Sequence, residues 1–382
     1  MPPVNAFRAA DEVEEFFPLD LYFCKSCGLI QLGKIVPPEK LFTNYLHLSS
    51  ASAGNIRHLK EVSLLLENMG LVSGKRILEI GSNDGTLLGL LQSAGAKVLG
   101  VDPAANLAQN TKSLQVSSLV GFFNDSFAMV MEENELSFDT IVALNVIAHT
   151  PTFISALKGI KRLLKPNGTF FMENAYVLDT ILEGQFDTIY HEHIFCFSLH
   201  ALIKAYNLVG LKAVDAELIP TQGKSIRVYV KHGDMAEQPS ARLNAILEHE
   251  GQIGFNSFDS FENASLKIAQ FKQKFINYLK KSDGNKFIGL GAPARGIVIL
   301  NYCGANQNDF EFIIDDTELK QGKLAPGCSI PVKNWDAIDP LIHHQFIILS
   351  WNYAEDMIEK LRSLGICGTV LIPFPNFKEI TI

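Results

Sequence analysis

A buried strand that runs into a glycine turn and then a helix is the feature that most constrains this chain. The strand is expected at residues 76–80, the turn at 81–85 and the helix at 86–92. A second short strand, residues 97–101, ends in Asp102. A glycine turn lets the backbone approach a ligand closely, and an acid at the tip of the next strand can accept hydrogen bonds from ribose hydroxyls. The pattern predicts a nucleoside-containing cofactor at the C-terminal edge of a parallel sheet.

The residues of the turn indicate which cofactor it binds. A dinucleotide fingerprint has the spacing G-x-G-x-x-G and faces a pyrophosphate. Here the turn reads Gly-Ser-Asn-Asp-Gly, and the acidic Glu79 precedes it. An acid beside the turn suits a cationic ligand without phosphate, and S-adenosylmethionine combines an ammonium group, a sulfonium and a ribose. An ordinary strand–turn–helix without a ligand is the alternative. The predicted cofactor-binding residues of this region are Glu79, Gly81, Asn83, Gly85 and Asp102.

Length and charge limit the class of protein. A chain of 382 residues is long enough for two or three domains, and its net charge of −8 argues against nucleic-acid binding through phosphate neutralisation. No apolar run is long enough to span a bilayer, and the N-terminus has no apolar signal segment. We therefore expect a cytoplasmic monomer or homodimer that binds neither nucleic acid nor membranes. The six cysteines are too sparse for a disulfide scaffold.

The middle of the chain alternates between strand and helix patterns, which predicts a doubly wound, mostly parallel sheet. The last strand, residues 225–230, is expected to add antiparallel to this sheet near its edge. The fold class is therefore α/β, with a Rossmann-like core over residues 71–235 and a small N-terminal domain over residues 1–70. The expected strands are 76–80, 97–101, 118–122, 140–144, 169–173, 212–215 and 225–230, with helices at 86–92, 152–164 and 199–207.

A second α/β domain is expected over residues 236–382. Residues 234–240 have the composition of a linker, and apolar residues between Phe258 and Leu279 recur at helical spacing. A second strand–glycine–helix unit follows at 287–296. Strands at 312–314, 346–349 and 369–372 and a helix at 353–364 complete the domain.

Taken in order, the motifs resemble those of the three-domain sugar C-methyltransferases, which use S-adenosylmethionine to methylate a carbon of a nucleotide-linked 4-keto-deoxysugar. Each motif is weak by itself, but their order over nearly the whole chain is specific. The resemblance implies a class I methyltransferase core and a place in deoxysugar biosynthesis. The matching segments are residues 17–21, the pair Cys24-x-x-Cys27, and residues 45–50, 78–88, 190–193, 225–230, 291–293 and 320–327.

Two positions depart from the family pattern. The family has two CxxC pairs that bind one zinc ion, whereas this chain has only Cys24 and Cys27 before the core. Structural zinc requires four ligands, so a zinc site and a turn with two reduced cysteines both stay open. The family also tends to have glycine where this chain has Lys224, which can contact a phosphate or stay solvated.

Carbon methylation beside a ketone needs a base that removes the α-proton and donors that stabilise the enolate oxygen. Tyr190, His191, Glu192 and His193 follow one another after the fifth strand. The resemblance implies that His193 is the base, with Tyr190 and Glu192 beside it, and an imidazole that titrates near ~6.5 suits this role. Tyr45 is a further candidate donor. A buried polar cluster that stabilises a domain junction is the alternative.

The remaining candidates concern the cofactor and the acceptor. Asn145 and His149 follow the fourth strand, where methyltransferases border the methionine part of the cofactor. The glycine turn at 291–296 opens a helix whose N-terminus can bind the diphosphate of a nucleotide sugar. We expect the C-terminal domain to bind this nucleotide and the middle domain to bind the methyl donor. The candidate substrate-binding residues are His191, Lys224, Arg227, Arg295, Lys320 and Lys323.

Three other functions remain open from the sequence. An O- or N-methyltransferase of a small molecule would use the same cofactor fold without an enolate-forming base. A nicotinamide-dependent oxidoreductase would use Gly289-x-Gly291. No acid is clearly placed at the tip of the next strand, although Asp315 and Asp316 follow a later strand. A non-catalytic scaffold would leave the polar residues 190–193 unexplained.

Overall fold

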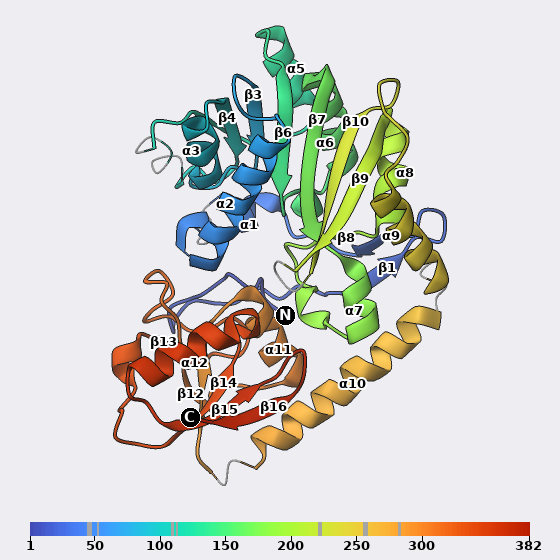
Figure 1. Cartoon of the computed structure of the whole chain (residues 1–382). Helices are drawn as coiled ribbons and strands as arrows, with labels where there is room; N and C mark the ends of the chain where they lie inside the picture. The colour runs from blue at the N-terminus through green and yellow to red at the C-terminus, as the bar shows by residue number, and fades with distance from the viewer. Residues whose placement is uncertain are drawn as a thin grey trace. The chain divides into compact units, whose positions relative to one another are not determined.

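The chain forms two compact units, each assembled from separate stretches of sequence (Figure 1). The central unit combines Leu21–Leu178 with Glu192–Ser257, and the terminal unit combines Met1–Asp20, Asp179–His191 and Phe258–Ile382. This division differs from the three expected domains, because the first residues and the stretch before Glu192 belong to the C-terminal core. The computed structural model describes residues 1–43, 48–51, 53–107, 111, 114–220, 224–254, 259–281 and 284–382.

Seven strands form the main sheet of the central unit, in the order β5-β4-β3-β6-β7-β10-β9. The first five are parallel, and β10 runs antiparallel to both β7 and β9. This order confirms the predicted doubly wound sheet with an antiparallel addition. The strands are β3 (Arg76–Ile80), β4 (Lys97–Asp102), β5 (Ser118–Val120), β6 (Phe138–Leu144), β7 (Leu164–Ala175), β9 (Leu211–Ile219) and β10 (Ser225–His232).

Amphipathic helices connect these strands. Leu59, Val62 and Leu66 on α2 pack in one buried cluster with Ile77 of β3 and Phe171 of β7. This packing fixes α2 against the middle of the sheet. The helices are α1 (Pro38–Phe42), α2 (Ala53–Asn68), α3 (Thr86–Ser93), α5 (Asp125–Glu133), α6 (Phe153–Leu163), α7 (Val177–Glu183), α8 (Leu199–Val209) and α9 (Ala241–Gln252), with short 3-10 turns η1 (Ser49–Ala51) and η2 (Ile147–His149).

The turn between β3 and α3 requires glycine at two positions. Gly81 has φ +72° and Gly85 has φ +81°, a region that side chains with a Cβ rarely adopt. A Cβ on Gly81 would also lie 2.2 Å from a methyl group of Val146. The strand–turn–helix predicted from this stretch is therefore confirmed.

A small three-stranded sheet lies beside the cysteine turn, with the order β1-β2-β8. Strands β1 (Leu21–Phe23) and β2 (Ile30–Leu32) form a hairpin, and β8 (Phe195–Cys196) pairs antiparallel with β2. The turn of the hairpin is closed by a hydrogen bond from the Cys24 amide to the carbonyl of Leu29, with an N···O distance of 2.9 Å. The sheet thus joins the N-terminal hairpin to the residues that follow His193.

The terminal unit has its own sheet, in the order β13-β12-β11-β14-β15-β16, which is parallel except for β16. Its strands are β11 (Phe287–Leu290), β12 (Phe310–Ile314), β13 (Val332–Lys333), β14 (His344–Ile348), β15 (Gly368–Ile372) and β16 (Lys378–Thr381). Its helices are α10 (Asp259–Leu279), α11 (Ala294–Cys303) and α12 (Ala354–Ser363), with 3-10 turns η3 (Phe186–Thr188), η5 (Trp335–Ala337) and η6 (Trp351–Tyr353).

Helix α9 and strand β16 are among the elements that the sequence did not predict. Helix α9 begins after Ser240, whose hydroxyl accepts a hydrogen bond from the amide of Leu243, so a separate helix precedes α10. Strand β16 was not expected, because its sequence Lys-Glu-Ile-Thr has only one strongly apolar residue. In the part of the chain that the structure describes, no helix is long and apolar enough to cross a bilayer.

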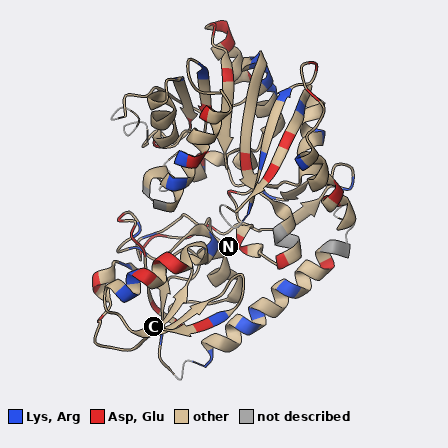
Figure 2. Ribbon diagram, viewed as in Figure 1, with Lys and Arg blue, Asp and Glu red and all other residues tan. Residues whose placement is uncertain are grey.

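Acidic and basic residues are interspersed along the elements of both units (Figure 2). Arg162 on α6, for example, bridges Asp125 and Glu132 on α5, with N···O distances of 3.1 and 2.7 Å. Exposed pairs of this kind contribute little to stability. The buried ion pairs described below are the ones that constrain the site.

Candidate functional site

The turn predicted to bind the cofactor, residues 81–85, is fixed by carboxylates and backbone amides. Both oxygens of Asp102 accept hydrogen bonds, one from the amide of Asn83 and one from the amide of Ala104, each with an N···O distance of 2.8 Å. Asp102 lies at the end of β4, as the sequence predicted. Each carboxylate oxygen keeps a second lone pair, so this position can still accept hydrogen bonds from a ligand.

Glu79, on β3 just before the turn, has an incomplete set of partners. Its side chain is buried, and its Oε2 has no hydrogen-bond partner within the described residues. Burial, together with the negative charges of Asp102 and Asp84, raises the pKa of Glu79 well above its usual value. A buried carboxyl without a cation is costly, so this arrangement suits a positively charged ligand group.

The segment before α2 is attached to the same turn. The amide of Ser49 donates to Oδ1 of Asn83 at 2.9 Å, and the amide of Ser50 donates to Oδ2 of Asp84 at 2.8 Å. Tyr45, predicted to act in catalysis, lies outside the described residues. The start of α2 is therefore tied to the residues predicted to bind the cofactor.

The loop after β6 is held by the end of β7. Asn145 has φ +56°, and its amide donates to the carbonyl of Glu173 at 2.8 Å. The amide of Ala148 donates to Oδ1 of Asn174 at 3.3 Å. A non-glycine residue in this left-handed region is uncommon and often marks a functional loop.

His149, at the end of this loop, packs its ring beside the ring of His193. The ring centroids of His149 and His193 lie 4.9 Å apart, and the ring of Phe42 stacks on His149 with a centroid distance of 5.7 Å. Burial, with a smaller contribution from His193, holds the pKa of His149 well below its usual value. Its Nε2 is buried and has no partner within the described residues. His149 is therefore a neutral ring with an unused polar atom beside His193.

The small sheet sets the position of His193. Ile194, the next residue, accepts a hydrogen bond on its carbonyl from the amide of Leu32 at 2.9 Å, and β8 then pairs with β2. Glu192, on the other side of His193, is 2% exposed. The hairpin that contains Cys24 and Cys27 thus supports the predicted catalytic histidine.

Tyr190 and His191 belong to the terminal unit, because the division between the units falls after His191. Tyr190 packs in the hydrophobic core of that unit. His191 is fully buried, with Nε2 at 3.2 Å from the carbonyl oxygen of Phe17, and burial lowers its pKa. These contacts give His191 a packing role, whereas the sequence had suggested substrate binding.

Arg227 also differs from its predicted role in substrate binding. It lies on β10, directly opposite Glu173 on β7 and Glu217 on β9. Its guanidinium pairs with Glu173 at 2.6 Å and with Glu217 at 3.0 Å. Two carboxylates already neutralise this cation, so it is not available to a phosphate. Lys224, the other candidate in this region, is exposed and has φ +85°.

Arg295 has a buried partner as well. Its guanidinium pairs with the fully buried Asp187 at 2.8 Å and lies 4.5 Å from the ring of Trp351, which also donates a hydrogen bond to Asp187 at 2.7 Å. The charge of Arg295 is therefore balanced inside the terminal unit. The role in phosphate binding that the sequence suggested has no support in these contacts.

Lys320 lies near the second glycine turn. Its ammonium is 3.5 Å from Asp315 and donates to the carbonyl of Ala292 at 2.9 Å. Asp315 follows β12, which neighbours β11 in the sheet. The sequence interpretation assigned Asp315 to a later strand, whereas it stands at the tip of the strand next to β11. Lys323 is half-buried on the following turn.

Cys24 and Cys27 lie in the hairpin turn of the small sheet. Backbone and side-chain hydrogen bonds from Cys27 lower the pKa of Cys24, whereas burial raises the pKa of Cys27. Within the described ranges, no group of three or more His, Cys, Asp or Glu side chains could bind a metal ion. Two ligands do not make a structural zinc site, so these residues do not fit bound zinc by themselves.

Sequence reasoning missed the pair of His58 and Glu173, whose side-chain N···O distance is 2.7 Å. The available signal was Glu173 itself, an acid at the end of the apolar run Thr-Phe-Phe-Met. A carboxylate in a strand that is buried on both faces requires a cation. The sequence alone did not indicate which residue supplies it.

Family models match three parts of the chain: "Putative zinc binding domain" over residues 1–42, "Methyltransferase domain" over residues 55–216 and "C-methyltransferase C-terminal domain" over residues 220–375. A magnesium protoporphyrin IX methyltransferase from Synechocystis PCC 6803 with bound SAH aligns with a TM-score of 0.38 and 16% identity, over 46% of this chain and 83% of that chain.

Two curated relatives are similar in sequence. A ubiquinone biosynthesis O-methyltransferase of Paracidovorax citrulli is 28% identical over 151 residues, which cover 36% of this chain and 61% of the relative. The C-methyltransferase NovU of Streptomyces niveus is 30% identical over 372 residues, which cover 96% of this chain and 89% of the relative. The resemblance expected from the motifs is therefore confirmed, and the chain belongs to the family of S-adenosylmethionine-dependent C-methyltransferases.

Proposed function

We propose that the chain transfers a methyl group from S-adenosylmethionine to the carbon beside the ketone of a nucleotide-linked 4-keto-deoxysugar. The observation that carries the proposal is the pair of His149 and His193, with ring centroids 4.9 Å apart. Burial and the charge of His193 disfavour a proton on His149 and lower its pKa. His193 is then the ring of the pair that accepts the proton of the substrate.

The contacts of the glycine turn support S-adenosylmethionine as the donor, which supplies a methyl group activated by a positive sulfonium. Its ammonium group would satisfy the buried Oε2 of Glu79, which lacks a partner within the described residues. The second lone pairs of Asp102 would accept hydrogen bonds from ribose hydroxyls. The other proposed cofactor residues are Gly81, Asn83, Gly85, Asn145 and His149.

In the proposed reaction His193 takes the proton from the carbon next to the ketone. The electron pair left on that carbon forms the new carbon–carbon bond to the methyl group, and the bond between methyl and sulfur breaks with its electrons staying on sulfur. Glu192 is proposed to orient the imidazole, and Tyr45 and Tyr190 to donate to the enolate oxygen. Alignment of donor and acceptor supplies on the order of 7–11 kcal/mol of the barrier.

The nucleotide of the acceptor is proposed to bind at the end of β11 in the terminal unit. Gly291 has φ +81°, and the first amides of α11 have no partner within the helix, which suits a diphosphate. Asp315, at the tip of the neighbouring strand, suits a ribose. Lys320 and Lys323 stay in the proposed set, whereas Arg295 leaves it because Asp187 neutralises it.

The experiment is methyl transfer from labelled S-adenosylmethionine to dTDP- and GDP-linked 4-keto-6-deoxysugars, followed by mass spectrometry. We expect a product with a new methyl group that resists ether cleavage in wild type and its loss in His193→Asn. His343→Asn, at an exposed position of the terminal unit, is the matched control and should retain activity. A methyl group that ether cleavage removes would indicate an O-methyltransferase and contradict the proposal.

A further inference from the structure

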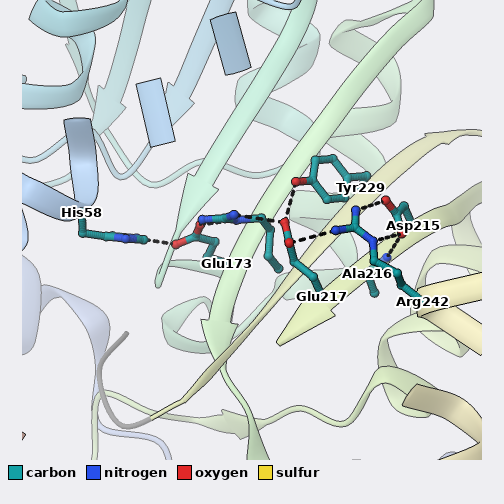
Figure 3. Close-up of polar contacts among 8 residues, drawn as sticks. His58, Glu173, Asp215, Ala216, Glu217, Tyr229 and Arg242 are labelled. Atoms are coloured by element: carbon teal, nitrogen blue, oxygen red, sulfur yellow. Dashed lines mark hydrogen bonds and ion pairs between the residues drawn. The ribbon is translucent and has the colours of Figure 1, made fainter. Parts of the chain in front are cut away.

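A line of alternating charges crosses the antiparallel part of the central sheet and ends on α2 (Figure 3). Glu173, Arg227 and Glu217 lie in register on β7, β10 and β9, so their side chains project from the same face. Arg242 on α9 contacts Glu217 at 3.0 Å and also pairs with Asp215. At the other end, Nε2 of His58 lies 2.7 Å from Oε2 of Glu173.

His58 completes the set of polar contacts around Glu173 at the end of this line. The guanidinium of Arg227 pairs with Oε1 of Glu173 at 2.6 Å, and Nε2 of His58 lies 2.7 Å from its Oε2. Glu173 is only 1% exposed on its side chain, so loss of one of its two partners would leave a buried carboxylate underpaired.

Glu173 also holds the loop that brings the two histidines together. Its carbonyl accepts the amide of Asn145, and the next residue, Asn174, accepts the amide of Ala148. These two bonds set the path of the chain up to His149. The side chain of Glu173 thus contacts His58 on α2 and Arg227 on β10, while its backbone carbonyl accepts a hydrogen bond from the loop.

The helix that carries His58 is tied at its start to the cofactor turn. Ser49 and Ser50 donate their amides to Asn83 and Asp84, and Asn55 donates to the carbonyl of Ser49 at 2.8 Å. The span from Ser49 to His58 therefore has two attachments, one at the turn predicted to bind the methyl donor and one at the end of β7.

We propose that His58 is a positioning residue, which sets the cofactor turn relative to the loop that carries His149. It acts through Glu173 and touches no reacting group. The expected loss of activity rests on the proposed function. The expected loss of backbone protection near His149 follows from the contacts alone and can be measured without a substrate. A 1 Å misplacement of reacting groups can cost about a hundredfold in rate.

The first test is hydrogen–deuterium exchange of the purified chain, without and with S-adenosylhomocysteine. In His58→Leu we expect at least about tenfold faster exchange in peptides covering residues 49–55 and 145–150, with β3 and β10 unchanged. In His58→Gln we expect wild-type protection, because the amide nitrogen of glutamine occupies nearly the place of Nε2 and can donate to Glu173. Unchanged exchange in residues 145–150, or faster exchange over the whole chain, would overturn the proposal.

The second test separates turnover from binding, using the keto-sugar assay above. We expect kcat of His58→Leu to fall about tenfold to a hundredfold, with KM for S-adenosylmethionine within about threefold of wild type, and His58→Gln to recover most of kcat. A loss confined to KM would contradict a positioning role.

Arg242→Gln is the matched control. It removes a charge from the same line of residues, but at the half-exposed end where Arg242 pairs with Asp215. We expect it to keep kcat and the exchange pattern of residues 145–150. An equal loss in Arg242→Gln would assign the effect to the charge line as a whole and overturn the specific role of His58. If wild type methylates no keto sugar, the exchange experiment still decides the inference.

Discussion

Replacement of Glu79 by glutamine should stabilise the protein and weaken cofactor binding at the same time. The carboxyl is buried near Asp84 and Asp102, and its pKa is raised, so the folded chain holds this proton more tightly than the unfolded chain. The sign follows from linkage: stability from this group is present below its unfolded pKa, near ~4.3, and is lost as pH rises through the folded value. At neutral pH, which is above the unfolded pKa, the carboxyl therefore lowers the stability of the folded chain.

The stabilisation follows from removal of the buried negative charge, because glutamine stays neutral at every pH. Each unit by which folding raises a carboxyl pKa costs about 1.4 kcal/mol above that pKa, and 1 kcal/mol corresponds to roughly 2–4 °C in Tm for a unit of this size. We expect Glu79→Gln to raise Tm by a few degrees. A hydrogen bond between charged groups contributes about 1.5–3 kcal/mol, so Kd for S-adenosylhomocysteine should rise roughly tenfold to a hundredfold.

The assay is thermal unfolding together with calorimetric titration of S-adenosylhomocysteine, which retains the ammonium group. Asp139→Asn is the matched control, because Asp139 on β6 accepts a hydrogen bond from the amide of Arg76 at the start of β3, the end away from Glu79. Burial opposes ionisation of Asp139, but hydrogen bonds from Lys165 and the Arg76 amide outweigh it and lower the pKa. This control should lower Tm and leave Kd unchanged. A lower Tm for Glu79→Gln, or an unchanged Kd, would refute the reasoning.

Three further predictions concern other parts of the chain. Arg295→Ala removes the cation of the fully buried Asp187, and urea denaturation should give a loss of about 3–5 kcal/mol; a loss below about 1 kcal/mol would contradict the pairing. The pKa of His149 is lowered, so the unfolded chain binds this proton more readily and stability should fall as pH drops through about 6.5; His149→Asn should flatten this slope, and an unchanged slope would count against it. Cys24 and Cys27 supply only two ligands, so a chelator should leave Tm unchanged, and a clear fall would mean that further ligands complete a zinc site.

The parts of the fold that are determined by residues close together in the sequence were predictable. The turn between Gly81 and Gly85 needs a left-handed backbone at both glycines, and the buried strands on either side are continuous apolar runs. Asp102 falls at the tip of the next strand for the same local reason. Periodicity and turn chemistry contain this information directly.

The long-range pairings were not predictable from one sequence. His58 and Glu173 are 115 residues apart, and Arg227 meets Glu173 only because β10 adds antiparallel in one particular register. Arg295 looked like a phosphate ligand because nothing nearby in sequence neutralises it, whereas Asp187 is 108 residues away. A charged side chain in an apolar segment indicates that a partner exists, but the tertiary fold determines which one.

The central claim is that a carbon–carbon bond forms, and carbon-13 NMR of the product tests it most directly. The acceptor is a uniformly carbon-13-labelled nucleotide 4-keto-6-deoxysugar, and the donor carries a carbon-13 methyl group. We expect the transferred methyl carbon to show one-bond coupling to a sugar carbon, with no such product in His193→Asn. A transferred methyl without carbon–carbon coupling would mean attachment to oxygen or nitrogen and would contradict the account.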